Sequence, residues 1–162
     1  MRRSAARQTK VFLTFAASDV TLVRPLTTRL TAAGGLTLDE GVPSTPFTGP
    51  RSDIIRASLL ARLRRCAGAL CLYRPGTLED EWVLWSLTVA QALELPLLRA
   101  PLPGDAADES EHILAELGAA FVPLSGEAIV ARIHDRERGQ RRATLDVASI
   151  AETLHLMRHP LR

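Results

Sequence analysis

The chain has 162 residues, which most simply form one domain that is large enough to bury a proper hydrophobic core. Apolar residues make up 46% and charged residues 23%, as in ordinary soluble globular proteins, and a net charge of only +2 argues against nucleic-acid binding. No apolar run approaches the roughly 20 residues that a membrane span needs.

Short apolar runs alternate with helical spacing through the first half of the chain. Pro25 lies within the first helical pattern and is tolerated best in a first turn, which predicts that regular helix begins near Val23. Asp19 or Ser18 is expected to cap this helix. The elements expected here are a polar leader (1–9), a strand (10–15), the helix just described, a strand (36–38), a long proline-rich loop (41–50) and a helix from a Ser52-Asp53 cap to Leu63.

The second half of the chain contains the most apolar predicted strand. Residues 69–73 (ALCLY) are apolar throughout, as expected of a central parallel strand that is covered on both faces. The helix from Trp82 to about Glu94 is apolar on nearly all sides and should be largely buried. The elements that follow are a strand (96–99), a helix (109–117), a strand (120–124), a helix from a Ser125 cap to Ile133, a charged linker (134–142) and an amphipathic helix with Val147, Ile150, Ala151, Leu154 and Met157 on one face. This last helix either packs on the domain or offers an oligomer contact.

Five apolar strands that alternate with helices predict an α/β fold. We expect a flavodoxin-like, doubly wound, five-stranded parallel sheet of order 2-1-3-4-5 with an extra C-terminal helix. The expected domain covers residues 10–133 and is followed by a tail over 134–162. Ligands of such sheets bind beyond the carboxyl ends of the strands, at the switch between strands one and three. Residues 15–19, 39–50 and 74–82 should meet there.

Several chemically active residue types are expected to have structural roles. Cys66 and Cys71 are expected to be buried reduced thiols in a cytosolic protein, because a disulfide between a helix end and a strand five residues on is geometrically awkward. The histidines fall outside the predicted pocket, so we predict no metal site. The N-terminus lacks the apolar region of a secretory signal, and we expect a cytoplasmic location.

The junction between the central strand and the next helix carries the most information. Residues 69–86 read ALCLYRPGTLEDEWVLWS, with a Gly76-Thr77 turn and a helix that opens on Trp82 and Trp85. With the proline-rich loop and the arginine-rich helix before it, this stretch resembles bacterial TIR-like domains, above all those of Thoeris-type antiphage systems. The likeness spans roughly residues 10–133. The family signature ends in Trp-Val-x-Trp-Glu, and Ser86 stands at the glutamate position.

The resemblance implies cleavage of the nicotinamide–ribose bond of NAD, with release or cyclisation of an ADP-ribose product. A carboxylate stabilises the oxocarbenium-like ribose or binds its hydroxyls, which the neutral hydroxyl of Ser86 cannot do equally well. Losing one preorganised group of this kind costs on the order of 10²–10³ in rate. Glu81 is the candidate for a displaced acid, although Glu79, Asp80 and Glu81 also suit the cap and dipole of the helix.

The same resemblance implies a nucleotide-binding set. Phe15 is the candidate for stacking on nicotinamide and Trp82 for a pocket wall, while Asp39 and Gly41 begin the loop that gates the site and mediates assembly. Structural roles remain open, because Phe15 suits the core, Asp19 suits a helix cap, and the tryptophans suit packing on the buried helix. The full set is Phe15, Ser18, Asp19, Asp39, Gly41, Gly76, Thr77 and Trp82.

Three hypotheses follow from this sequence. The favoured one is a TIR-like domain of bacterial immune signalling that turns NAD over poorly and requires no cofactor. It acts by binding NAD or a related nucleotide, or by assembly with its own copies or a TIR-type partner. The second is an active NAD glycohydrolase or ADP-ribosyl cyclase that uses a displaced acid such as Glu81. The third is an enzyme similar to nucleoside deoxyribosyltransferases, which also needs a glutamate in the pocket.

Overall fold

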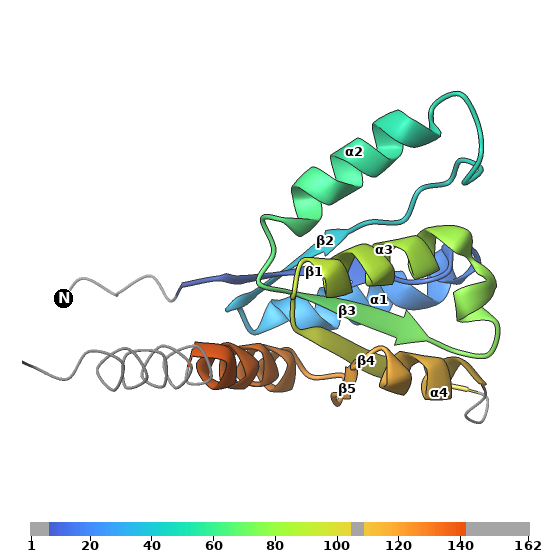
Figure 1. Ribbon diagram of the computed structural model, residues 1–162. Coiled ribbons are helices and arrows are strands. Elements are labelled where there is room, and N and C mark those ends of the chain that lie inside the picture. Colours follow the sequence, from blue (N-terminus) through green and yellow to red (C-terminus); the bar gives the residue numbers. More distant parts are fainter. Residues whose placement is uncertain (1–6, 105–108, 142–162) are drawn as a thin grey trace, which may run out of the picture.

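A five-stranded parallel sheet forms the centre of the molecule. The computed structural model describes residues 7–104 and 109–141, and its strands run in the order β2-β1-β3-β4-β5 (Figure 1). The predicted fold class and strand order are therefore confirmed. The strands are β1 (Thr9–Thr14), β2 (Leu36–Glu40), β3 (Gly68–Tyr73), β4 (Leu97–Pro101) and β5 (Ala120–Phe121).

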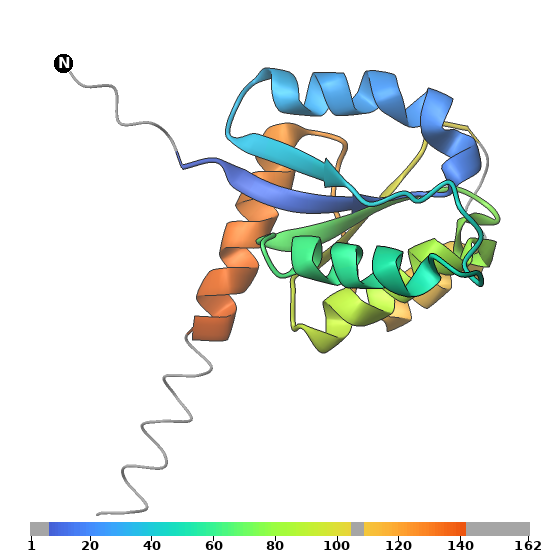
Figure 2. The ribbon, with the colours of Figure 1, turned by 90° about the horizontal axis from the view of Figure 1, so that it is seen from above.

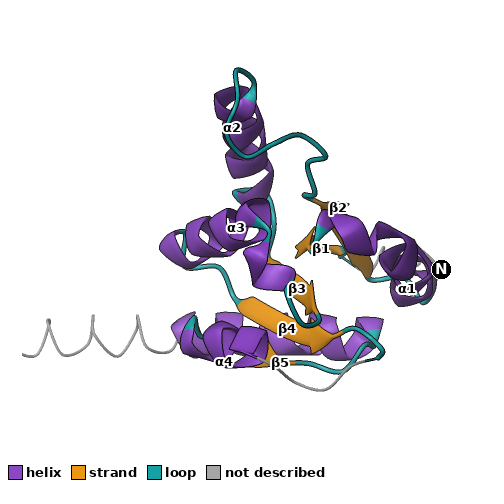
Figure 3. Ribbon diagram, turned by 90° about the vertical axis from the view of Figure 1, so that its right-hand side faces the viewer, coloured by secondary structure: helices purple, strands orange, loops and turns teal. Residues whose placement is uncertain are grey.

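Helices cover both faces of the sheet, as Figure 2 shows. One face packs against α1 (Val20–Ala32) and a helix over residues 126–141, around a core that includes Leu30 and Ile129. The other face packs against α2 (Ser52–Leu63), α3 (Glu81–Ala92) and α4 (Glu109–Glu116), around Phe12 and Leu87. In the side view of Figure 3, α2 stands away from the sheet at its amino-terminal end.

Burial explains why β3 lies in the middle of the sheet. All six of its residues are buried, and it pairs with β1 on one side and β4 on the other. Cys66 and Cys71 are both buried and unbridged, as predicted. Desolvation by burial raises the pKa of the Cys71 thiol to about 12 and that of Cys66 to about 11, so both thiols are protonated near neutral pH.

The start of the first long helix was predicted wrongly. The short 3-10 helix η1 (Ala17–Asp19) leads directly into α1 at Val20, so Pro25 lies inside the helix and not in its first turn. The amide that proline lacks would face the carbonyl of Thr21, an exposed residue, where water can replace the missing bond. Asp19 occupies the cap position, but its side chain makes no cap hydrogen bond.

Two other boundaries differ from the prediction. The Ser52 hydroxyl donates to the carbonyl of Gly49 at 2.7 Å, so Ser52 closes the preceding turn and is the first residue of α2, not its cap. Strand β5 ends at Phe121, three residues before the predicted end. Strand β5 is an edge strand that pairs with β4 on one side. With no second strand to pair with in the described part of the chain, it stays short.

The segment predicted as a charged linker is helical as far as it is described. The helix over 126–141 continues without a break through residues 134–141. Its polar side chains bind the amino-terminal edge of the sheet: Arg136 Nη1 donates to Leu97 O at 2.9 Å and to Gly118 O at 3.1 Å, and His134 Nε2 lies 3.2 Å from Thr9 Oγ1. The predicted stripe from Val147 to Met157 lies outside the described residues. None of the helices in the described parts of the chain is long and apolar enough to cross a membrane.

Candidate functional site

Three segments meet at the carboxyl edge of β1 and β3, as the topology predicted. The backbone amide of Ala17, just after β1, donates to Asp80 Oδ2 at 3.1 Å. Trp82 Nε1 donates to the carbonyl of Thr45 at 2.8 Å and so binds the connection between β2 and α2. We call this connection, residues 41–51, the strap. These two bonds place the first loop, the strap and the start of α3 in contact with one another.

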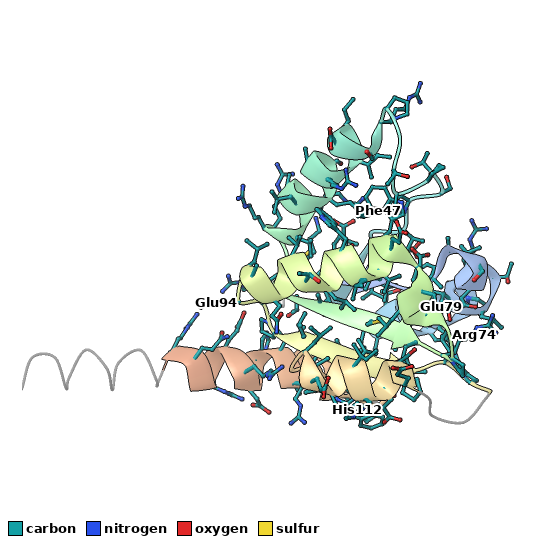
Figure 4. The ribbon with its side chains drawn as sticks, turned by 45° about the vertical axis from the view of Figure 1, so that its right-hand side comes forward. Phe47, Arg74, Glu79, Glu94 and His112 are labelled. Atoms are coloured by element: carbon teal, nitrogen blue, oxygen red, sulfur yellow. The ribbon has the colours of Figure 1, made fainter. Side chains whose placement is uncertain are left out.

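The buried carboxylate of this edge is Asp19, which is only 1% exposed. Its Oδ1 lies 2.7 Å from Nε of Arg74, the residue that follows β3, in an ion pair that lacks the alignment of a hydrogen bond. Figure 4 shows Arg74 at the carboxyl end of the sheet. A buried charge is tolerated when it is paired, and Arg74 supplies the opposite charge for Asp19. The pair joins the first loop to the end of β3.

The turn between β3 and α3 is built by local bonds. Gly76 has φ 86°, a left-handed conformation that favours glycine. The Thr77 hydroxyl is buried, accepts from the Arg74 amide and donates to the Arg74 carbonyl, at 2.9 Å in both cases. Asp80 Oδ1 accepts from the Trp82 amide at 3.0 Å and caps α3, as one of the two interpretations of the acidic run predicted.

Ser86 lies one helical turn after Trp82 and is 1% exposed. Its hydroxyl has no hydrogen-bond partner among the described residues. Glu81, the first residue of α3, and Glu79, in the turn before it, are by contrast exposed. Figure 4 labels Glu79 in this turn. The proposed substitute acid Glu81 therefore lies at the solvent-facing side of the helix start, while the Ser86 position is buried against the sheet.

Phe15 and Trp82 lie on opposite faces of the sheet. Phe15 is 1% exposed and belongs to the core beneath α1, while Trp82, 5% exposed, belongs to the core around α3. One ligand ring cannot contact both side chains in this arrangement. Ser18 is exposed in η1, just before α1. The structure thus brings the predicted segments together without joining the two predicted aromatic residues in one pocket.

Asp39, near the end of β2, and Gly41, the first residue of the strap, have structural contacts. Asp39 Oδ1 accepts from Arg62 Nε at 3.0 Å, and its Oδ2 lies 3.7 Å from Lys10 Nζ. The hydrogen bond from Arg62 lowers the pKa of Asp39 more than burial raises it. Gly41 is required for packing, because a Cβ there would lie 1.9 Å from the ring of Phe12. A hollow of about 380 Å³ separates the strap from α2 beside this cluster.

Sequence reasoning missed two residues of this region, Phe47 and Arg56. The Phe47 ring packs edge-on against Trp82 with centroids 4.9 Å apart, and the Arg56 guanidinium lies over both rings. An aromatic residue inside a polar, proline-rich loop was the signal available, since such a side chain is expected to find an apolar partner.

Metal chemistry has no visible basis in the described part of the chain. Across residues 7–104 and 109–141, no three His, Cys, Asp or Glu side chains form a group that could hold a metal ion. His112, labelled in Figure 4, lies on α4 and pairs with Glu116 at 3.2 Å. Comparison with known proteins adds no constraint: no family model matches the sequence, and no curated protein matches it.

Proposed function

We propose that this protein is a TIR-like domain of bacterial, antiphage-type immune signalling that turns NAD over poorly and acts by binding a nucleotide or by TIR-type assembly. The observation that carries the proposal is Ser86. It occupies the glutamate position of the resembling signature, one turn after Trp82, and it is a buried neutral hydroxyl. No charge is available at that point to stabilise an oxocarbenium-like ribose.

The neighbouring carboxylates support the same proposal. Asp19 is paired with Arg74, and Asp80 is bound to the amides of Ala17 and Trp82. An acid that acts on a substrate must be free to accept a proton or to face developing charge. Both of these carboxylates hold the local fold instead, which leaves the exposed acids as the alternative.

The test is nicotinamide release from NAD by the purified full chain. We expect turnover close to the uncatalysed background, together with saturable binding of NAD or ADP-ribose in calorimetry or a mass that rises with protein concentration in light scattering. Absence of both binding and self-association, with folded protein, would reject the proposal. Robust nicotinamide release would reject its non-catalytic part.

Glu81 and Glu79 offer a matched pair for the alternative of an active NAD glycohydrolase or cyclase. Both are exposed acids, Glu81 at the start of α3 and Glu79 in the turn before it, and only Glu81 directly precedes Trp82. An enzyme that uses Glu81 should lose on the order of 10²–10³ in rate with Glu81→Gln and little with Glu79→Gln. Turnover gained by a folded Ser86→Glu variant would instead identify a site that has lost its carboxylate.

A further inference from the structure

Phe47 and Trp82 form an aromatic corner at the boundary of the strap and α3. Their rings meet at 69° with centroids 4.9 Å apart. The Arg56 guanidinium carbon lies 4.4 Å from the Phe47 centroid and 5.6 Å from the Trp82 centroid, over both rings. Two negative ring faces thus enclose one flat cation, which is the arrangement that cation–π attraction favours.

The corner is assembled from separate parts of the chain and is held by polar bonds. Arg56 Nη2 donates to the Phe47 carbonyl at 2.9 Å, and Trp82 Nε1 donates to the Thr45 carbonyl at 2.8 Å. Asp53, whose side chain is 96% exposed, lies 3.0 Å from Arg56 Nη1 and adds a negative charge beside the corner. The Arg56 side chain is 26% exposed, so solvent reaches the cation.

We propose that this aromatic corner is a binding site for flat, delocalised organic cations, and that Arg56 occupies it as an internal ligand. Guanidinium and pyridinium groups suit the site, because they are planar and less strongly hydrated than an ammonium and can stack on an aromatic face. An external cation binds only in the fraction of molecules in which Arg56 has left, so its apparent affinity is reduced by that fraction.

This inference goes beyond the proposed function, because the corner takes flat cations of either the guanidinium or the pyridinium kind and requires neither a nucleotide nor assembly. It also gives Asp53 a role after the exchange. The carboxylate of Asp53 remains beside the corner when the Arg56 side chain has moved, and it attracts the incoming cation. A neutral ring of the same shape lacks both attractions.

The test uses the full chain and a matched pair of probes, the cation 1-methylnicotinamide and neutral nicotinamide. The reporter is the Trp82 indole N–H signal in NMR, since this group donates to the Thr45 carbonyl and belongs to one of the two rings that a bound cation would contact. Arg56→Gln should bind the cation at least about tenfold more tightly than the wild type does. Neutral nicotinamide should gain no affinity. Arg65→Gln, which removes an exposed arginine just beyond α2, should behave as the wild type.

Two further variants make the result decisive. Adding Phe47→Leu to Arg56→Gln removes one wall and should abolish the gain. Arg56→Lys retains a charge but places a compact ammonium in the corner, so a smaller gain in the same direction is expected, and this variant carries the test if Arg56→Gln fails to fold. An equal gain for both probes, or no gain in any folded Arg56 variant, overturns the proposal.

Discussion

Replacing Ser86 with alanine should make the protein more stable, although most substitutions of buried residues do the reverse. The Ser86 hydroxyl is 1% exposed and has no hydrogen-bond partner among the described residues. A buried polar group without a partner costs about 1–3 kcal/mol, and alanine favours the helix interior over serine by about 0.5 kcal/mol. The small void left by the oxygen offsets part of this gain. We expect a net increase of about 1 kcal/mol in the free energy of unfolding.

The assay is urea or thermal unfolding followed by circular dichroism. A gain of 1 kcal/mol corresponds to a rise of about 2–4 °C in Tm for a chain of this size. Thr88→Ala is the matched control, because Thr88 lies on the same helix, is exposed, and donates to Leu84 O at 2.8 Å. Only the gain in helix propensity, about 0.5 kcal/mol, is expected there. A clear loss of stability in Ser86→Ala alone would refute the reasoning and would mean that the hydroxyl is bound to something in solution.

Three more predictions concern other parts of the fold. Asp39→Asn should cost about 1 kcal/mol at pH 7, allowing for solvent screening of the Arg62 pair. Because the pKa of Asp39 is lowered, its stabilisation is complete above the ordinary value of 3.8 and is lost as pH falls below it. In urea unfolding, the free energy of unfolding of the variant should therefore fall less steeply with acid than that of the wild type. Cys66 and Cys71, with pKa values of about 11 and 12, should resist a disulfide reagent at pH 8 in the native protein and react after unfolding, and rapid native reaction would contradict their burial. Glu94→Gly should raise stability by about 1 kcal/mol in thermal unfolding, because Glu94 has φ 58°.

Much of the fold could be predicted because it follows from local patterns. The fully apolar run over residues 69–73 identified the central strand, and alternation of strands with helices identified the parallel sheet. The helical state of residues 134–141 could not be predicted in this way. That segment is rich in charge, and it is anchored by contacts such as the bonds of Arg136 to Leu97 and Gly118, which depend on tertiary structure.

The candidate site shows the same division between local and distant contacts. Topology correctly predicted which segments meet, but it did not predict how their side chains are used. The partner of Asp19 is Arg74, just after β3, and the partner of Phe47 is Trp82, on α3. Phe15 faces the core beneath α1. It continues the alternation of β1, in which Val11 and Leu13 face the same core, so its side chain points away from Trp82.

The amino edge of the sheet receives both ends of the described chain. Strand β1 starts there, and the helix over 126–141 runs along the same edge in Figures 1 and 2. His134 and Arg136 bind this helix to Thr9 and Leu97. The aromatic corner and the Asp19–Arg74 pair lie at the opposite rim. A tether or fluorescent label introduced beside residue 7 or residue 141 therefore leaves that rim facing free solution. Immobilised protein can be used for ligand screening in this orientation.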